Sequence, residues 1–395
     1  MKYILLTLIA LAQVAFVSAR ATYNIKDFGA KGNGKSSNTI AINNAIKACH
    51  ENGGGIVLVP AGKYLSGTIE MLDNVELRLA EGAELIASLD LNDYKPYKCL
   101  RDDFMKYKVA YTEYWNRSFI LAQRVKNIAI TGDGVINSNH LVDPNGEGRS
   151  RGPHCIMLGE VDGVTIRGVH ITEASNYGVM GYEVVNATFD NIKVTKGHDA
   201  IHLRGAKNLM IRDCSFETGD DCIAGININD LQVRRCVLNT SCNGFRIGGV
   251  GIYVRDCYVF GPGYYPHRKT VVKGKFDELP REQGRHNLVC LVDYFGSQNY
   301  PYEASDLHFE NCIVEGANEV IHYHANQNHL QNGTYLGTME LTNVRFTDLS
   351  YPTWCEAPDH SPMKVVLKDV SWTFKDGRES PLFLVEQSKN MTVEQ

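Results

Sequence analysis

The sequence predicts an all-β fold, a single-stranded right-handed parallel β-helix with a capping helix at its N-terminal end. Three observations support this prediction. Short apolar runs rich in β-branched residues recur about every 22 residues from residue 164 onward. One helical pattern, over residues 38–52, precedes them. The composition, with 44% hydrophobic and 22% charged residues, is typical of a folded globular chain.

The composition also excludes several classes of protein. A chain of 395 residues with 36 glycines and 11 cysteines is not a disordered segment, a collagen-like fibre or a disulfide-stabilised miniprotein. The 40 Lys and Arg residues against 45 Asp and Glu residues give a net charge of -5. Because there is no basic excess, we expect neither nucleic acid nor a membrane surface as a partner.

The first 21 residues have the pattern of a cleaved signal peptide. Lys2 supplies a positive charge, an apolar segment runs from Ile4 to Phe16, and small residues follow. The apolar segment is short for a membrane span. We therefore expect residues 1–21 to be removed and residues 22–395 to form a single exported β-helix domain, secreted or periplasmic.

The predicted helix follows Asn38, a residue suited to the N-cap position. Its apolar side chains fall on one face, at Ile42, Ala45, Ile46 and Cys49, and it ends at the glycines of residues 53–55. A helix at the open end of a solenoid covers apolar surface and strand edges. We therefore expect it to cap the β-helix.

The repeat is defined by five runs that start at residues 164, 187, 209, 231 and 252, which differ by 23, 22, 22 and 21. A period this short leaves no room for a long helix and fits about three short strands per coil. Five residues after the starts lie Val169, Ile192, Cys214, Cys236 and Cys257. We expect this column to stack inside the coils, with cysteine acting as a small buried hydrophobe rather than a redox or metal group.

Two regions interrupt the repeat. Residues 92–118 are rich in Tyr and Trp, and residues 261–287 combine Tyr with His, Lys and Arg. Long insertions in a solenoid often line a binding surface. Aromatic side chains that pack inward over the coils are the equally weighted alternative.

The repeat also aligns polar residues. Twelve residues after the starts come Asn176, Asp199, Asp221 and Asn243. One position earlier come Ser175, His198, Asp220 and Cys242, and fifteen residues after the starts come His202, Ala224 and Arg246. Since stacked coils lie about 4.8 Å apart, Asp199, Asp220 and Asp221, the Asp trio, should converge on one patch.

Three carboxylates this close cannot all ionise without cost, so one is expected to keep its proton to higher pH. A protonated acid beside ionised carboxylates is what glycoside hydrolysis needs. Turn formation by Asp and calcium binding are the competing interpretations. The alignment of all three by an independent repeat favours catalysis.

The stretch from about residue 23 to 260 resembles the polygalacturonase family of glycoside hydrolases (family 28). The resemblance rests on the opening "YNIKDFGAKGNGK" and, more specifically, on "GHDAIHL", "GDDCIAG" and "CNGFRIGG". It implies a pectin-degrading β-helix enzyme that works with inversion. It also implies that Asp220 is the general acid, and that Asp199 and Asp221 activate the attacking water.

The sequence departs from the family pattern around this trio. Asn243 stands where the family has a histidine, and His198 is a candidate substitute. The family's Arg-Ile-Lys motif is absent, so Lys273 in "HRKTVVKGK" and Arg246 are candidates for binding a substrate carboxylate or sulfate. Tyr177 and His202 complete the expected substrate-binding set. A disulfide between Cys222 and Cys242 on adjacent coils is left open.

The predicted function is hydrolysis of O-glycosidic bonds in an acidic plant or algal polysaccharide, of polygalacturonan or rhamnogalacturonan type. We expect a monomer with no cofactor and no metal. A uronate-polysaccharide lyase or epimerase on the same fold is one alternative; either would need a base that abstracts the proton next to a carboxylate. A non-catalytic carbohydrate-binding solenoid is the other.

Overall fold

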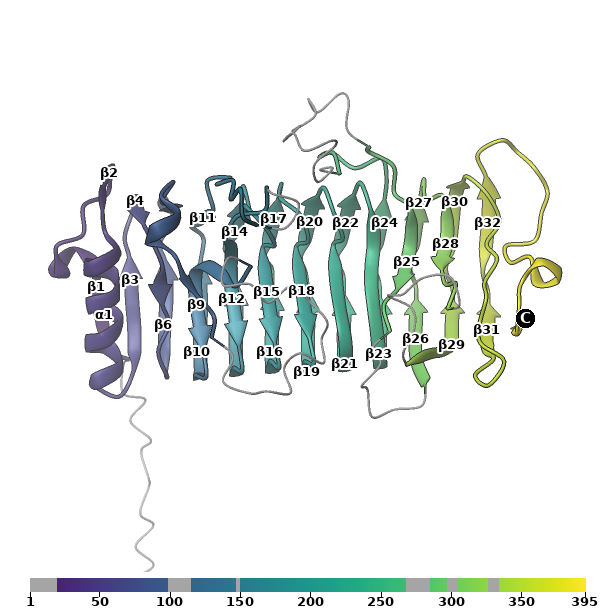
Figure 1. The fold of residues 1–395 in the computed structure, drawn as a ribbon, viewed down its shortest axis with the longest axis horizontal. Coiled ribbons are helices and arrows are strands. Elements are labelled where there is room, and N and C mark those ends of the chain that lie inside the picture. The colour runs from purple at the N-terminus through teal and green to yellow at the C-terminus, as the bar shows by residue number, and fades with distance from the viewer. Residues whose placement is uncertain (1–19, 99–114, 147–149, 268–284, 297–303, 326–333) are drawn as a thin grey trace, which may run out of the picture.

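The computed structural model describes residues 20–98, 115–146, 150–267, 285–296, 304–325 and 334–395. Within them the chain winds into stacked coils whose strands lie side by side along the long axis, from the N-terminal to the C-terminal end (Figure 1). The described strands form two sheets, one of 21 strands and one of 12. Every pairing between named strands is parallel except that of β8 with β9, which confirms the predicted all-β parallel fold.

The larger sheet contains β1 (Thr22–Asn24), β3 (Gly55–Val59), β5 (Ile69–Glu70), β6 (Val75–Leu79), β8 (Lys95–Pro96), β9 (Arg117–Gln123), β10 (Lys126–Gly132), β12 (His154–Gly159), β13 (Asp162–Arg167), β15 (Val179–Tyr182), β16 (Val185–Asp190), β18 (Ile201–Arg204), β19 (Lys207–Arg212), β21 (Ile223–Arg234), β23 (Asn243–Arg255), β25 (Cys290–Tyr294), β26 (Ala304–Glu310), β28 (Glu319–His322), β29 (Tyr335–Thr342), β31 (Met363–Lys368) and β33 (Met391–Glu394). The smaller sheet contains β2 (Asn33–Ser37), β4 (Gly62–Ser66), β7 (Ala83–Ala87), β11 (Val135–Asn137), β14 (His170–Thr172), β17 (Lys193–Thr195), β20 (Ser215–Thr218), β22 (Val237–Thr240), β24 (Tyr258–Phe260), β27 (Ile313–Glu315), β30 (Arg345–Leu349) and β32 (Ser371–Phe374).

The coils follow the register that the repeat predicts. Val164 pairs with Ala187, Ala187 with Leu209, and Leu209 with Leu231, so the aligned run starts are neighbours on successive coils. A typical coil carries three short strands, such as β13, β14 and β15. In β21 and β23 two of these strands merge into one long strand that belongs to two ladders.

The interior of the coils is a continuous apolar core. The cysteine column is buried as expected, and Cys312 extends it by one coil. Each thiol lies close to the main-chain oxygen two residues earlier, at 3.3 Å for Cys236 and 3.2 Å for Cys257. Phenylalanines from different strands also fill the interior, and Phe189, Phe216 and Phe245 are fully buried. Burial of each such ring stabilises the fold by about 1.5–3 kcal/mol.

All ten cysteines in the described residues are buried free thiols. Cys222 and Cys242 therefore do not form the disulfide that the sequence left open. Stability along the solenoid comes from the stacked core and the strand ladders rather than from cross-links between these coils.

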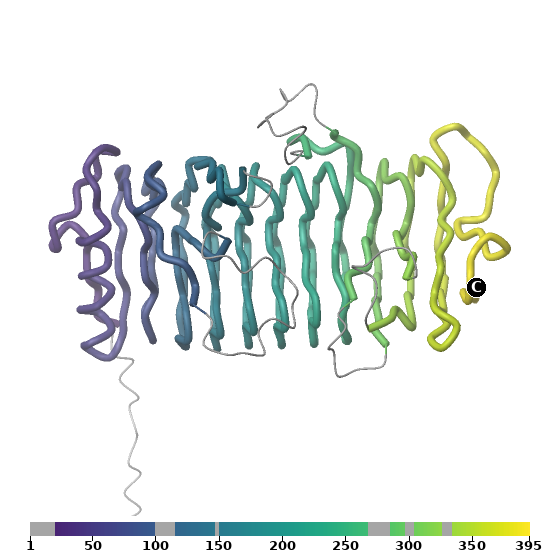
Figure 2. The backbone as a smooth tube through the Cα atoms, viewed as in Figure 1, coloured from purple at the N-terminus to yellow at the C-terminus, as the bar shows by residue number. Residues whose placement is uncertain are grey.

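Helix α1 (Thr39–Glu51) lies across the N-terminal end of the solenoid (Figures 1 and 2). Its buried face is the predicted one, and it packs against β1, β3 and the short helix η1 (Ile25–Phe28). Asn38 precedes the helix, but its side chain makes no capping hydrogen bond. Its amide instead ties the entering chain to Lys31 N, Ser36 O and Leu65 O.

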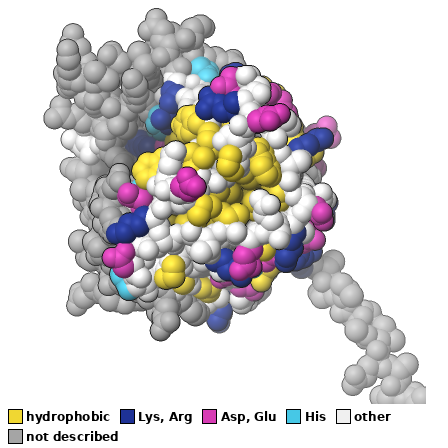
Figure 3. All heavy atoms as spheres, turned by 90° about the vertical axis from the view of Figure 1, so that its right-hand side faces the viewer, with side chains coloured by type: hydrophobic (Ala, Val, Ile, Leu, Met, Phe, Trp, Pro, Cys, Tyr) yellow, Lys and Arg dark blue, Asp and Glu magenta, His cyan; other side chains and the backbone are white. Residues whose placement is uncertain are grey.

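The opposite end carries the C-terminal segment, with the short helix η7 (Val385–Gln387). Seen end-on, apolar side chains gather near the centre of this face and charged side chains surround them (Figure 3). A shallow pocket at this end is lined by residues that include Leu382, Leu384 and Val393. In the part of the chain that the structure describes, no helix is long and apolar enough to cross a membrane.

The first interruption packs inward where it is described. Tyr97 and Trp115 are buried in a small second apolar cluster with Tyr177, Tyr182 and Phe295. Tyr97 stacks on Tyr182 with ring centroids 5.7 Å apart. For these residues the inward-packing alternative is correct; residues 99–114 lie outside the described part of the chain.

Candidate active site

The Asp trio lies in two neighbouring turns of the solenoid. Asp199 follows β17 and precedes β18, and Asp220 and Asp221 lie in the equivalent turn between β20 and β21. Ala200 N donates to Asp221 O at 3.1 Å, and Cys222 N donates to Asn243 O at 3.1 Å. These bonds extend the strand ladder into the turns, and they stack Asp199, Asp221 and Asn243 as the repeat predicts.

The carboxylates of the trio converge closely. One oxygen from each of Asp199, Asp220 and Asp221 lies within 4.8 Å of the other two. The consecutive residues Asp220 and Asp221 thus keep their carboxylates together. The residues are buried, with exposed fractions of 2% for Asp199, 7% for Asp220 and 1% for Asp221. Burial strengthens the repulsion among the carboxylates because little water screens it.

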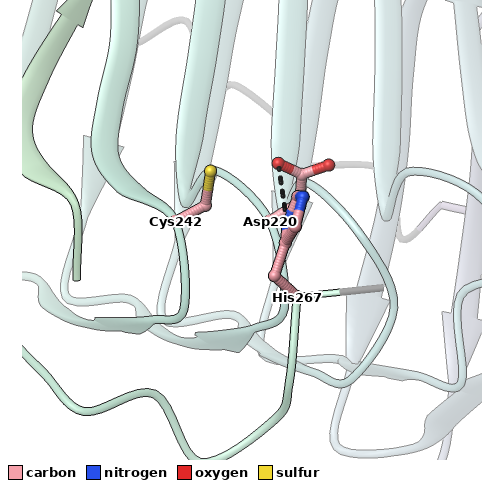
Figure 4. A group of neighbouring side chains, drawn as sticks. All are labelled: Asp220, Cys242 and His267. Carbon is pink, nitrogen blue, oxygen red and sulfur yellow. Dashed lines mark ion pairs between the residues drawn. The ribbon is translucent and has the colours of Figure 1, made fainter. Parts of the chain in front are cut away.

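Asp220 is surrounded by cationic or basic groups. Arg151 Nη2 donates to Asp220 Oδ2 at 2.9 Å, and His198 Nδ1 lies 3.8 Å from the same oxygen. His267, which follows β24 in the second interruption, places Nδ1 3.7 Å from Oδ1 (Figure 4). Burial alone would raise the pKa of Asp220, but His198, Arg151 and His267 together hold this pKa well below its ordinary value.

Asp221 has a different environment. Asn243 Nδ2 donates to its Oδ1 at 2.7 Å, while Arg246 Nη1 lies 3.8 Å from Oδ2. Arg246 also approaches Asp293, with Nε 3.4 Å from Oδ2, so its charge is shared. Burial and the charge of Asp220 raise the pKa of Asp221 to about 7.

Asp199 is contacted by His202, whose Nδ1 lies 2.7 Å from Asp199 Oδ2. Burial and the neighbouring carboxylates of Asp220 and Asp221 raise the pKa of Asp199 well above its ordinary value. The trio therefore divides into an ionised Asp220 and two carboxyls, Asp199 and Asp221, that hold protons to higher pH. The sequence predicted that one member would do so; the structure assigns this property to the pair flanking Asp220.

Aromatic rings support the imidazole of His202. Tyr177 stacks on it with centroids 4.8 Å apart and planes inclined by 6°, and Phe295 meets it edge-on at 6.2 Å. Burial and the charge of Arg204 lower the pKa of His202 well below its ordinary value, so the ring is neutral. Tyr177 is itself 7% exposed, so in this structure it packs within the site.

The structure brings most of the predicted site residues together. Tyr177, His198, His202, Asn243 and Arg246 all lie around the Asp trio. His198 faces Asp220, with Nδ1 3.8 Å from Oδ2, and its role as a substitute for the family's histidine stays a prediction. Lys273 lies outside the described residues.

Sequence reasoning missed four charged or titratable residues at the site, namely Arg151, Arg204, His267 and Asp293. Arg151 opens the stretch "RGPHCIML", yet it stands in a connection that the repeat does not align. His267 belongs to an interruption whose path the period does not predict. Arg204 lies two residues after His202, next to an aligned turn. A search for charged residues beside these turns would have found it.

Two groups in the described chain have donors suited to a metal ion: the Asp trio, and Asp220 with Cys242 and His267 (Figure 4). A guanidinium group contacts at least one donor of each. Arg151 pairs with Asp220, and Arg285 Nη2 lies 3.3 Å from Cys242 Sγ. These positive charges repel a cation, and burial raises the pKa of the Cys242 thiol well above its ordinary value, which opposes thiolate formation. The donors therefore do not fit a resident metal ion.

Comparisons with known proteins agree with this architecture. An exopolygalacturonase of Arabidopsis thaliana is 24% identical over 314 residues, which cover 76% of this chain and 65% of that protein. The match thus spans less than two thirds of the relative's length. An exo-poly-α-D-galacturonosidase of Dickeya chrysanthemi is 27% identical over 248 residues, 51% of this chain and 41% of that protein.

Solved structures share the fold. An exopolygalacturonase from Thermotoga maritima superimposes with a TM-score of 0.69 at 17% identity, over 95% of this chain and 92% of that one. The A-module of a mannuronan C-5 epimerase from Azotobacter vinelandii superimposes with a TM-score of 0.54 at 16% identity, over 94% of this chain and 100% of that one. Both carry a coiled parallel β architecture like the one described above.

A family model covers the N-terminal cap, the Asp trio and Asn243 in one match. It describes rhamnogalacturonase A and epimerase proteins of the pectate lyase-like type, and it matches residues 22–263. The chain therefore belongs to the rhamnogalacturonase A/epimerase, pectate lyase-like family.

Proposed function

We propose that the protein is an exported glycoside hydrolase that cleaves O-glycosidic bonds in an acidic pectic polysaccharide or oligosaccharide by single displacement with inversion. The observation that carries this proposal is the convergence of three buried carboxylates within 4.8 Å on two stacked turns. Relatives named as polygalacturonases support the pectic class of substrate.

In this mechanism Asp220 protonates the glycosidic oxygen as the bond to the anomeric carbon breaks. Asp199 and Asp221 hold a water on the opposite face of the sugar, and one of them removes its proton. A pKa of about 7 suits Asp221 to this task, because a general base works best when its pKa lies near the working pH. Asn243, by donating to Asp221, keeps that carboxyl oriented.

The cationic residues support an acidic substrate. Arg151 and Arg246 lie within reach of the trio, and an arginine binds a carboxylate through two parallel hydrogen bonds. Arg246 is the more exposed of the two, with 28% of its side chain accessible, but Asp221 and Asp293 already share its charge.

The test is incubation with a panel of polygalacturonan, rhamnogalacturonan and sulfated polysaccharides, followed by identification of the released ends. We expect new reducing ends from a pectic substrate. The Asp220→Asn variant, which should lose most of its activity, tests whether any activity belongs to this site. No released ends from any polymer would refute the hydrolase proposal.

A second candidate function is that of a uronate lyase or epimerase. One structural neighbour is named as an epimerase, which supports keeping this candidate. These reactions remove the proton next to a carboxylate, for which His198, His267 and Tyr177 are bases at hand. The same incubation separates the candidates. A lyase releases unsaturated sugar ends that absorb ultraviolet light, and an epimerase changes the sugar composition without releasing ends.

A further inference from the structure

We propose that Arg151 is a substrate-exchanged clamp on the general acid: the carboxylate of an acidic sugar draws Arg151 away from Asp220, and Asp220 then takes up the proton that it donates. The proposal rests on the proposed function and adds a residue that positions charge for the reaction. It also resolves a conflict at the site, since a general acid must carry a proton and Asp220 is paired with a cation.

The clamp has two ends. Arg151 Nη2 donates to Asp220 Oδ2 at 2.9 Å, and Arg151 Nη1 donates to the Tyr177 hydroxyl at 3.0 Å. The guanidinium carbon also lies 5.3 Å from the centre of the Tyr177 ring. If Nη2 leaves Asp220, the arginine therefore remains held by Tyr177, beside the position that it vacates.

The position of Arg151 permits this exchange. It lies in the connection before β12 rather than in a strand, so its movement breaks no ladder. The Arg151 and Asp220 side chains are each 9% exposed, whereas the Asp221 side chain is 1% exposed. Both side chains of the Arg151–Asp220 pair are therefore partly accessible. In the Asp221–Arg246 pair only the Arg246 side chain, at 28%, is accessible.

Several other charged or titratable groups face Asp220, and they set its response. They are His198, His267, Asp199, Asp221, Arg246 and Cys242. Asp199 and Asp221 repel charge on Asp220 only when they are themselves ionised, and the two histidines lie farther from Asp220 than Arg151 does. Of the ion-pair distances between described residues and Asp220, that to Arg151 is the shortest, so the loss of Arg151 shifts the balance toward the protonated acid.

The charges balance through one turnover. The sugar carboxylate forms an ion pair with Arg151, and Asp220, having lost its cation, takes one proton from solvent. Asp220 gives that proton to the leaving oxygen. When the acidic product departs, Arg151 returns to the Asp220 carboxylate. A neutral sugar lacks the carboxylate, so it leaves the clamp closed.

The experiment measures binding of D-galacturonate and of D-galactose by isothermal titration calorimetry at about pH 6, in two buffers that differ in ionisation enthalpy. The difference between buffers gives the protons taken up on binding. For the wild-type protein we expect proton uptake with galacturonate and none with galactose. For Arg151→Met we expect galacturonate affinity to fall about 10- to 100-fold, with no proton uptake.

Two variants sharpen the test. In Asp220→Asn the arginine no longer faces a carboxylate, so galacturonate should bind more tightly than to the wild type and without proton uptake. Arg235→Met is the matched control, because it removes another Arg–Asp pair, with Asp213, on the outer surface. It should leave binding and proton uptake unchanged.

The proposal is overturned if the wild-type protein binds no galacturonate, binds it without proton uptake, or binds it equally well after Arg151→Met. Circular dichroism and thermal unfolding check that Arg151→Met is folded; if it is not, Arg151→Lys replaces it, and we expect weaker binding with less proton uptake. Since no turnover is needed, proton uptake without hydrolysis would refute the proposed function and leave the clamp standing.

Discussion

His202 lies between Arg204, which donates a hydrogen bond to it, and Asp199, which accepts one from it. Arg204 Nε lies 3.0 Å from His202 Nε2, and His202 Nδ1 lies 2.7 Å from Asp199 Oδ2. An arginine N–H can only donate, so Nε2 is the acceptor and the ring proton sits on Nδ1. The neutral imidazole therefore donates to Asp199, and Arg204 determines which nitrogen carries the proton.

This relationship predicts a role for Arg204 in positioning Asp199. In Arg204→Met the imidazole loses the contact that selects its tautomer, and Asp199 loses a fixed donor. We expect kcat to fall by up to about 100-fold while KM changes little, because the water is misplaced and substrate contacts remain. Steady-state kinetics measure this, and Arg204→Lys should recover part of the rate. Wild-type kinetics in Arg204→Met would contradict the assignment.

Asp220→Asn should lose most of its activity while the fold survives. An asparagine fits the same turn and accepts from Arg151, but it cannot supply a proton. General acid catalysis contributes about 100- to 10,000-fold, so we expect a loss of that order. The rate on the true substrate and the circular dichroism spectrum are the two readouts. Asp213→Asn, an outer-surface carboxylate paired with Arg235, serves as the control and should keep full activity.

Asp221→Asn should stabilise the protein at alkaline pH. The folded-state pKa of about 7 lies above the ordinary value of 3.8, so the fold favours the protonated form. Between these two pKa values, rising pH ionises the carboxyl in the unfolded chain while the folded protein keeps it protonated, so the free energy of unfolding falls. The penalty is complete above the folded-state pKa. Removing it should gain roughly 1–3 kcal/mol at about pH 8 and little at about pH 4.

Chemical denaturation at the two pH values measures this difference. Equal changes in the free energy of unfolding at both pH values would show that ionisation of Asp221 does not destabilise the folded protein. Activity should fall in the same variant, since the residue is also a proposed base.

The first sugar released should carry the opposite anomeric configuration to the substrate. Asp220 acts on one face of the ring while Asp199 and Asp221 hold water on the other. Inverting enzymes commonly separate their carboxyls by about 6.5–9.5 Å and retaining enzymes by about 5–5.5 Å. The nearest oxygens of the trio lie within 4.8 Å, so distance alone does not favour inversion.

Proton NMR of the product, recorded before mutarotation, decides between the two outcomes. Retention of configuration would mean that one of the trio attacks the sugar directly. It would remove the roles proposed for all three residues.

Much of the fold could be predicted from the sequence because a solenoid repeats its local rules. The spacing of the runs that start at residues 164, 187, 209, 231 and 252 predicts which strands are neighbours. Each coil stacks on the next, so residues at equal offsets must meet. For the same reason the sequence alone determined that Asp199, Asp220 and Asp221 converge and that Cys214, Cys236 and Cys257 stack inside.

What only the tertiary structure decided is the charge at each member of the trio. Arg151 and His267 come from connections outside the aligned strands, and no repeat offset predicts that both meet Asp220. They hold Asp220 ionised, while burial and like charge leave Asp199 and Asp221 protonated to higher pH. The repeat determines which side chains are neighbours, but a pKa depends on burial and on every charge nearby, including those that the connections bring from other coils.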